Sequence, residues 1–253
     1  MRYQELLTAP EHGLEAVWLS LSACAEHYRV LPDGRCDVIV QFDAGARPLR
    51  PLAVLIAGPA TRFYDVAHGP EIGFVGARLR PGYAAPLLGL EPSSLVDGHV
   101  GGEAALARWP ALRPLCAPAQ DCHEIAARLV AWAAERIAAA RFQPDGLLRD
   151  LLGSFHGAGG RLRIHDTAAR HQVSERTVQR LLREAIGLPP KTFANILQFH
   201  HALRLLSEQQ LPPAEAALQA GFADQAHMSR VFRRLGGFTP GRRPELTLVN
   251  IRG

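Results

Sequence analysis

The sequence predicts an α+β protein with a strand-rich N-terminal domain, a linking helix and an all-α C-terminal domain that contains two helix-turn-helix units. Short β-branched runs bounded by turn residues fill roughly the first 115 residues. From about Gln120 onwards, apolar residues recur at three- and four-residue intervals. A weak internal repeat with an offset of 50 residues lies in the helical part. We expect a strand-rich domain at 1–118, a helical linker at 119–156 and the two helix-turn-helix units at 157–253.

The composition is that of a soluble globular chain. Hydrophobic residues make up 47% of the 253 residues and charged residues 21%. No run approaches the roughly eighteen apolar residues that a membrane span needs. The N-terminal residues lack the apolar region of a secretory signal. Four scattered cysteines are too few for a disulfide scaffold. We therefore expect a cytoplasmic protein without a membrane partner.

Strand signals dominate the N-terminal part. Residues 38–40 and 54–56 are short apolar runs rich in β-branched side chains, and residues 72–79 alternate in polarity. The segment 31–34 reads Leu-Pro-Asp-Gly, in which proline fixes one φ angle and glycine frees another, so it predicts a turn. A short helix is expected over 84–90.

A long helix is expected over 121–141. Asp121 is a suitable N-cap, with Glu124 three residues further on. Apolar side chains form two adjoining stripes, which predicts a helix covered on more than one side. We expect a homodimer through this segment or the sheet domain, with Trp132 as an anchor; an intramolecular brace is the alternative. A shorter amphipathic stretch follows at 147–155, and the glycine-rich residues 157–160 predict the domain boundary.

The internal repeat carries most of the functional signal. Residues 173–183 resemble residues 222–233, and a short alanine-rich helix and a turn precede each copy. This order is the helix-turn-helix layout. Gly221 suits a turn with positive φ, and Ser174 and Asp224 are natural N-caps for the second helix of each unit. A helix over 190–208, with apolar residues on one face, would hold the two units at a fixed separation.

The second helix of each unit presents polar side chains that suit DNA. Val178, Leu181 and Leu182 form the apolar stripe of the first copy. Arginine and glutamine pair with base edges in the major groove and with phosphate. Residues 156–253 contain 14 Lys and Arg against 7 Asp and Glu, which favours an anionic partner. The predicted DNA-binding residues are Arg176, Gln179, Arg180, Arg183, Gln225, Ser229, Arg230 and Arg233.

Residues 161–245 resemble the DNA-binding domain of the AraC/XylS family of bacterial transcriptional regulators. The resemblance is carried by residues 221–233, GFADQAHMSRVFR, by GFTP at 237–240, and by GLPPK at 187–191. It implies that each second helix reads a major groove of double-stranded DNA through the positions just named. Gln172 departs from the pattern, since the family usually has glycine there, which predicts a strained first turn. Ala226 replaces a common polar reader.

The N-terminal part resembles, less specifically, a sensor-type domain found before this module in some family members. The matching stretches are LPDGRCDVIV at 31–40, Gly58-Pro59 and GARLRPG at 76–82. The resemblance implies a strand-rich, often cupin-like fold that binds a small-molecule effector or mediates dimerisation. Aromatic and charged side chains are expected to line a ligand pocket. The candidates of these types near predicted strands are Trp18, His27, Tyr28, Arg62, Tyr64 and Arg78.

Catalytic and metal-binding patterns are weak in this sequence. None of the cysteine and histidine groups, such as Cys24, His27 and Cys36, has the paired spacing of a structural zinc site. No phosphate loop, dinucleotide fingerprint or nucleophile elbow is present. Cys36 lies beside Arg35, which would lower a thiol pKa, but a packed strand cysteine is the simpler interpretation. We expect no enzyme activity, cofactor or metal.

These observations predict a sequence-specific transcription regulator that responds to a small-molecule effector. A ligand-free dimerisation module is the alternative for the N-terminal domain, and an enzyme domain targeted by the DNA-binding module is a third. If the regulator is an activator, RNA polymerase is a further partner. Because Ala226 replaces one reader, we expect the first unit to carry more of the base discrimination and the second more of the phosphate anchoring.

Overall fold

The chain folds into two compact units, each built from separate pieces of the sequence. The computed structural model describes residues 2–8, 12–21, 26–142, 145–242 and 247–249. Unit 1 comprises residues 1–27, 35–59 and 67–143, and unit 2 comprises residues 28–34, 60–66 and 144–253. The division thus falls at 143/144 rather than at the predicted 156/157. Two short segments from the N-terminal half belong to the same unit as the helix-turn-helix region.

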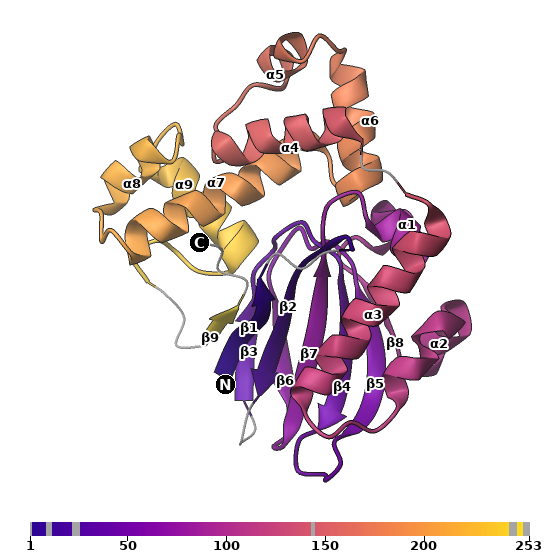
Figure 1. Ribbon diagram of the computed structural model, residues 1–253. Coiled ribbons are helices and arrows are strands. Elements are labelled where there is room, and N and C mark those ends of the chain that lie inside the picture. Colours follow the sequence, from indigo (N-terminus) through magenta and orange to yellow (C-terminus); the bar gives the residue numbers. More distant parts are fainter. Residues whose placement is uncertain (1, 9–11, 22–25, 143–144, 243–246, 250–253) are drawn as a thin grey trace. The chain divides into compact units, whose positions relative to one another are not determined.

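Unit 1 contains a six-stranded sheet in the order β1-β2-β7-β4-β5-β8, visible in Figure 1. The described neighbours all pair antiparallel. The three runs expected as strands are confirmed as β4, β5 and β7. Strands β1 and β8 form the two edges of this sheet. The closed, cupin-like arrangement stays a prediction. The bounds are β1 Arg2–Thr8, β2 Leu14–Leu21, β4 Asp37–Asp43, β5 Arg50–Ala57, β7 Ile72–Leu79 and β8 His99–Gly101.

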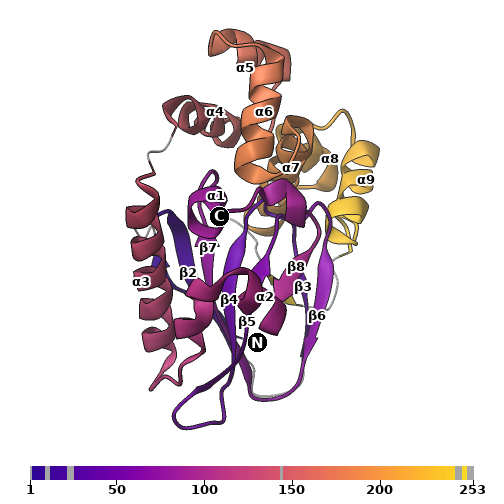
Figure 2. The same cartoon turned by 90° about the vertical axis from the view of Figure 1, so that its right-hand side faces the viewer.

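One face of this sheet is covered by a long helix, α3 (Cys122–Ala140), which packs on β2 and β7 (Figure 2). Alternate residues of the strands, such as Val17 and Val75, point into a shared core with Ile125 and Leu129. The expected N-cap is confirmed, since the Asp121 carboxylate accepts a hydrogen bond from the Glu124 amide. The remaining helices are α1 Ala84–Leu88, α2 Gly102–Arg108 and the 3-10 helices η1 Pro92–Leu95 and η2 Pro110–Cys116.

Both apolar stripes of α3 are used within unit 1. Trp132 is buried in the core, and Val130 and Ile137 pack against the same core. The second stripe had suggested a partner subunit, with Trp132 as its anchor. These contacts fit a brace within one subunit, and the homodimer stays a prediction.

Unit 2 is helical apart from a small three-stranded sheet in the order β6-β3-β9, in which β3 and β9 run parallel. Helix α4 packs against α6 and α7, so it belongs here and not to a separate linker. The helices are α4 Gly146–Gly157, α5 Ile164–Arg170, α6 Glu175–Ile186, α7 Pro190–Ser207, α8 Pro213–Gln219 and α9 Gln225–Gly236. The strands are β3 Glu26–Val30, β6 Tyr64–His68 and β9 Thr247–Val249.

Local sequence explains where the helices of unit 2 begin and turn. The Ser174 hydroxyl accepts from the Thr177 amide, and the Asp224 carboxylate accepts from the His227 amide, so both expected N-caps are confirmed. Gly221 has a φ of +78°, as the turn requires. Gln172 occupies the equivalent region with a φ of +55°, which confirms the expected strain in the first turn.

Among the helices of the described segments, none is both long and apolar enough to cross a membrane.

Candidate nucleic-acid interface

Helix α6 separates its side chains cleanly into a packed face and an exposed face. Val178 and Leu182 are fully buried, and Leu181 nearly so. This burial fixes the rotation of the helix about its axis, because residues three and four apart share a face. The outward face presents the four residues that the sequence predicted, all of them exposed: Arg176, Gln179, Arg180 and Arg183.

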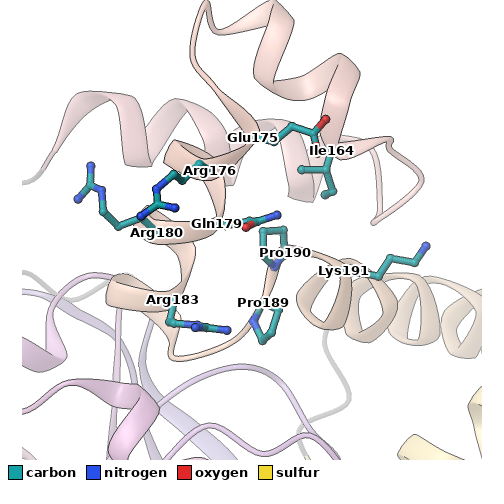
Figure 3. A pocket seen from close by; sticks show the side chains of 9 residues that line it. All are labelled: Ile164, Glu175, Arg176, Gln179, Arg180, Arg183, Pro189, Pro190 and Lys191. Atoms are coloured by element: carbon teal, nitrogen blue, oxygen red, sulfur yellow. The ribbon is translucent and has the colours of Figure 1, made fainter.

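A hollow of about 620 Å³ lies along this exposed face. Figure 3 shows side chains of α6 on one side of it and the start of α7 on the other. Lys191 joins the arginines there, although sequence reasoning did not assign it a site role. It is the only lysine of the chain and follows Pro189-Pro190 at a helix start, which was an available signal. The lining residues are Ile164, Glu175, Arg176, Gln179, Arg180, Arg183, Pro189, Pro190 and Lys191.

Two carboxylates reduce the net positive charge of this face. The Arg180 Nη1 donates to Glu184 Oε2 at 2.8 Å, one helical turn further along α6. Both side chains are more than half exposed, so the pair adds little stability. At the start of α6, Glu175 Oε1 lies 3.1 Å from His165 Nδ1 of α5. Glu184 thus orients the Arg180 guanidinium group along α6.

Helix α9 repeats the arrangement in the second unit. Met228 and Phe232 are fully buried, and the Phe232 ring lies 4.8 Å from that of Phe199, centroid to centroid. Ser229 is only half exposed, which limits its reach towards a base. The other three predicted contact residues of this helix are exposed: Gln225, Arg230 and Arg233.

Helix α7 connects the two helix-turn-helix units, as the sequence predicted, and packs against α6, α8 and α9. From its buried side, Gln198 Nε2 donates to the Ala220 carbonyl at 3.0 Å. Arg161 Nη1 donates to the Gln219 carbonyl at 2.9 Å. The last carbonyls of α8 are thereby satisfied by side chains from other elements. The turn of the second unit is thus held in place by α7 and by the segment before α5.

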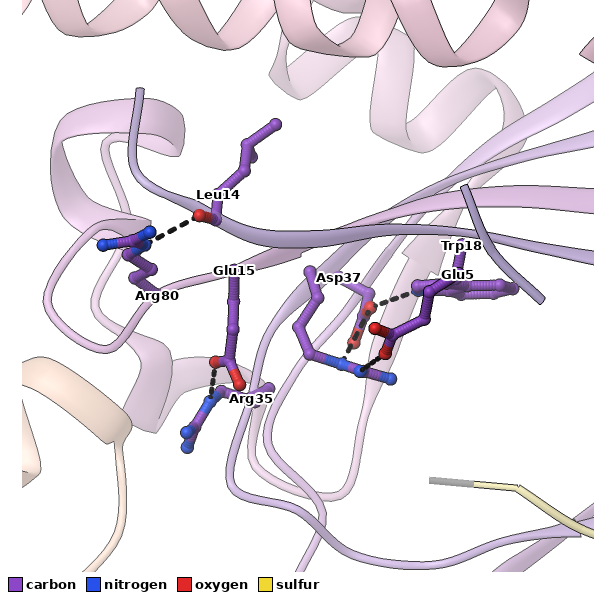
Figure 4. Close-up of polar contacts among 8 residues, drawn as sticks. Glu5, Leu14, Glu15, Trp18, Arg35, Asp37 and Arg80 are labelled. Carbon is purple, nitrogen blue, oxygen red and sulfur yellow. Dashed lines mark hydrogen bonds and ion pairs between the residues drawn. The ribbon is translucent and has the colours of Figure 1, made fainter. Parts of the chain in front are cut away.

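The predicted ligand-binding residues do not gather at one place. Trp18 and Arg78 lie on the same face of the unit 1 sheet and share Asp37, as Figure 4 shows for Trp18 and Asp37. The Trp18 indole donates to Asp37 Oδ1 at 2.8 Å, and Arg78 Nε lies 3.8 Å from the same oxygen. Arg78 also pairs with Glu5 at 3.6 Å. Sequence reasoning missed Asp37, although a carboxylate at the start of a β-branched run is an unusual strand residue.

The other four candidates lie on or near the small sheet. Tyr28 is buried, which raises its pKa to about 12. His27, Arg62 and Tyr64 are exposed. Since residues 28–34 and 60–66 belong to unit 2, most of these side chains lie in a different unit from Trp18 and Arg78.

Metal-binding and nucleophilic groupings are sparse in the described part of the chain. There, no cluster of three or more His, Cys, Asp or Glu side chains forms a metal site. Cys24 falls outside the described residues. The Cys36 thiol is buried at 5% exposure within the unit 1 core, which argues for the packed-cysteine interpretation.

Two helix-turn-helix units in one compact body, with arginine and glutamine on both second helices, define a double helix-turn-helix domain. Residues 167–243 match the family model described as a helix-turn-helix domain. The transcriptional activator RhaS of Escherichia fergusonii is 37% identical over 73 residues, which cover 29% of this chain and 26% of RhaS. The chain therefore spans about a quarter of the length of that relative. The chain therefore contains a helix-turn-helix domain at residues 167–243.

Other similarities extend outside this domain or concern its shape. Residues 11–101 match a model described as a domain of unknown function (DUF6597). The DNA-binding domain of AdpA, solved with a target DNA, is 24% identical with a TM-score of 0.36, covering 38% of this chain and 88% of that structure. ToxT from Vibrio cholerae bound to an unsaturated fatty acid is 13% identical with a TM-score of 0.43, covering 88% and 92%.

Proposed function

We propose that this protein is a sequence-specific DNA-binding transcription regulator. The observation that carries the proposal is the matched exposure of α6 and α9, since both capped helices bury one face and present arginine and glutamine on the other. Its relatives over this domain are described as transcriptional activators, which supports activation and RNA polymerase as a further partner. Such a regulator acts in the cytoplasm, has no enzymatic role and needs no cofactor.

The chemistry of the two helices suits the major groove. A guanidinium group pairs with the two acceptors of guanine, and a glutamine amide pairs with adenine. Arg176, Gln179 and Arg180 are the proposed base readers of α6, and Gln225, Ser229 and Arg230 those of α9. Arg183, Arg233 and Lys191 are the proposed phosphate contacts, and Lys191 lines the same hollow as Arg183. Half-sites about 34 Å apart on one face of the duplex would suit both helices.

The experiment is a selection of binding sites from randomised duplex DNA with the full chain, followed by mobility shift at several salt concentrations. We expect one recurrent bipartite sequence and an affinity that falls steeply with salt, because each neutralised phosphate releases counterions. Arg176→Ala should weaken binding, whereas Arg149→Ala, an exposed arginine of α4, should not. Recovery of no recurrent sequence would refute the proposed function.

We further propose that unit 1 binds a small-molecule effector. Ser20 lies two residues from Trp18 on β2, and its buried hydroxyl has no hydrogen-bond partner within the described residues. A polar group left unsatisfied in a protein interior is costly, and a ligand would satisfy it. Trp18 is the neighbour of Ser20 on this face of β2, Arg78 pairs with Ala16 further along the strand, and Tyr28, Arg62, Tyr64 and His27 remain weaker candidates. A ligand-free dimerisation module is the competing proposal.

Thermal unfolding of the full chain with a metabolite library tests the effector. A compound present at 100 times its dissociation constant stabilises the fold by about 2.7 kcal/mol, which is readily measured. Ser20→Val, which removes the hydroxyl, should abolish that shift. Sedimentation at micromolar concentration tests the dimer. A monomer with a stabilising ligand supports the effector, and a dimer without one supports the competing module.

A further inference from the structure

The first segment of unit 2, residues 28–34, contacts the helix-turn-helix region at three places. Arg29 reaches the C-terminal end of α9, where its Nη1 donates to the Gly236 carbonyl at 3.1 Å. The Pro32 carbonyl lies 2.7 Å from Nε2 of His200, a residue of α7 that is only 5% exposed. Gly34 lies so close to α7 and α6 that an added Cβ would meet the Phe193 ring at 3.2 Å and Ile186 at 3.4 Å.

The Arg29 side chain is fixed from several directions. Its Nε and Nη2 donate to the two carboxylate oxygens of Asp65 at 2.7 and 2.8 Å, a bidentate geometry that orients the guanidinium plane. The guanidinium carbon lies 4.0 Å from the centroid of the Phe63 ring. Only 12% of the side chain is exposed. Asp65 also raises the pKa of Arg29, so the charge persists at every physiological pH.

Arg29 donates to a carbonyl at the C-terminal end of α9, where the carbonyl groups have no N–H partner within the helix. The last carbonyls of an α-helix have no partner within the helix and carry partial negative charge. Gly236 is the final residue of α9, and Gly237 caps it with a φ of +72°. An added Cβ at Gly237 would meet Phe63 at 2.5 Å and Arg29 at 2.6 Å, so this terminus is packed closely against both side chains.

We propose that Arg29 is a positioning residue for DNA reading: fixed by Asp65 and Phe63, it holds the C-terminal end of α9 and thereby sets the orientation in which α9 meets its half-site. The inference rests on the proposed function and goes beyond it, because the residues come from the N-terminal half of the chain. They lie within residues 11–101, the stretch that matches a domain of unknown function. That domain therefore contributes a part of the DNA-reading unit.

The test separates positioning from charge and from general stability. In the full chain, Arg29→Lys keeps the charge but loses the bidentate fork, and Arg29→Ala loses both. Arg149→Ala is the matched control, since it removes an exposed arginine from α4 of the same unit. Affinity is measured by fluorescence anisotropy for the selected DNA site and for two versions, each with one half-site altered at a single base pair.

We expect the wild-type chain to lose about tenfold in affinity for either altered half-site. In both Arg29 variants, altering the α9 half-site should lower the affinity only about threefold. Altering the α6 half-site should lower it as much as in the wild type. Arg149→Ala should resemble the wild type. Wild-type behaviour of Arg29→Lys, or an equal change at both half-sites, would overturn the inference and leave the proposed function intact.

Two further outcomes of these experiments are also informative. If Arg29→Ala does not fold, Phe63→Leu tests the same contact from the other side of the guanidinium group, with the same expected pattern. If the wild-type chain selects no site, the proposed function fails, and this inference fails with it.

Discussion

Gln198 and Ala220 are joined by a buried hydrogen bond of 3.0 Å from the side-chain amide of the first to the carbonyl of the second. Gln198 lies in the middle of α7, and Ala220 ends α8 at the turn of the second helix-turn-helix unit. The helix that connects the two units therefore also satisfies the turn of one of them. A buried residue thus contributes to the geometry of the proposed DNA-binding surface.

Replacing Gln198 by methionine tests this bond. Methionine has a similar length but no N–H donor, so the Ala220 carbonyl would remain buried without a partner. We expect a loss of about 1–3 kcal/mol in the free energy of unfolding, measured with urea. Gln219→Met is the control, because the Gln219 side chain is exposed and bonds only to Glu215 among the described contacts. An equal effect of the two substitutions would contradict the prediction.

The first turn offers a stabilising substitution. Gln172 adopts a φ of +55°, a region that costs a non-glycine residue about 1–2 kcal/mol. Gln172→Gly removes this strain but frees the unfolded backbone, so we expect a net gain of about 0.5–1 kcal/mol in the free energy of unfolding. Arg149→Gly, at an exposed interior position of α4, should lose stability by a similar amount. A destabilised Gln172→Gly variant would refute the argument.

Much of unit 2 was predictable because its signals are local. The caps at Ser174 and Asp224 and the stripe around Val178 lie within a few residues of what they determine. The contact between Arg29 and Gly236 joins residues 207 apart, and no periodicity or turn signal encodes such a pairing. For the same reason, sequence reasoning placed 28–34 and 60–66 with the strand domain. It also named Trp18 and Arg78 without finding the carboxylate of Asp37 that joins them.

The two helix-turn-helix units should differ in what they contribute. Arg180→Ala is expected to cost about 1–3 kcal/mol in binding and to relax preference at particular base pairs. Arg233→Ala should weaken binding evenly across sequences and reduce the salt slope by about one. Parallel selections on randomised DNA with each variant measure both effects. Altered base preference in Arg233→Ala, together with unchanged preference in Arg180→Ala, would reverse the assignment.

Glu184 gives the Arg180 prediction an internal control. In the structure, Glu184 holds the Arg180 guanidinium along α6. Glu184→Gln removes a negative charge beside the proposed DNA face but leaves Arg180 present. It should therefore raise affinity for all sequences without the change in base preference expected of Arg180→Ala.

Acid should destabilise unit 2 through His201. Burial, followed by the nearby cations Arg204 and Arg161, lowers the pKa of His201 below 6.5 in the folded state. The unfolded chain then binds more protons, so the free energy of unfolding falls as the pH drops below about 6.5. His201→Gln should show a smaller fall between about pH 7.5 and about pH 5.5 in urea titrations. His123→Gln, at an exposed position of α3, is the comparison and should keep the full fall.

The discontinuous make-up of unit 2 has a consequence for how the protein is synthesised. Arg29, in the segment 28–34, leaves the ribosome 207 residues ahead of Gly236. The early segment must remain available until its partners arrive, because Pro32 and His200 are 168 residues apart and Arg29 and Gly236 are 207 apart. Pairings so distant along the chain form late. Unit 2 is thus completed only after Gly236 has emerged, and a shorter nascent chain lacks the assembled surface that we propose binds DNA.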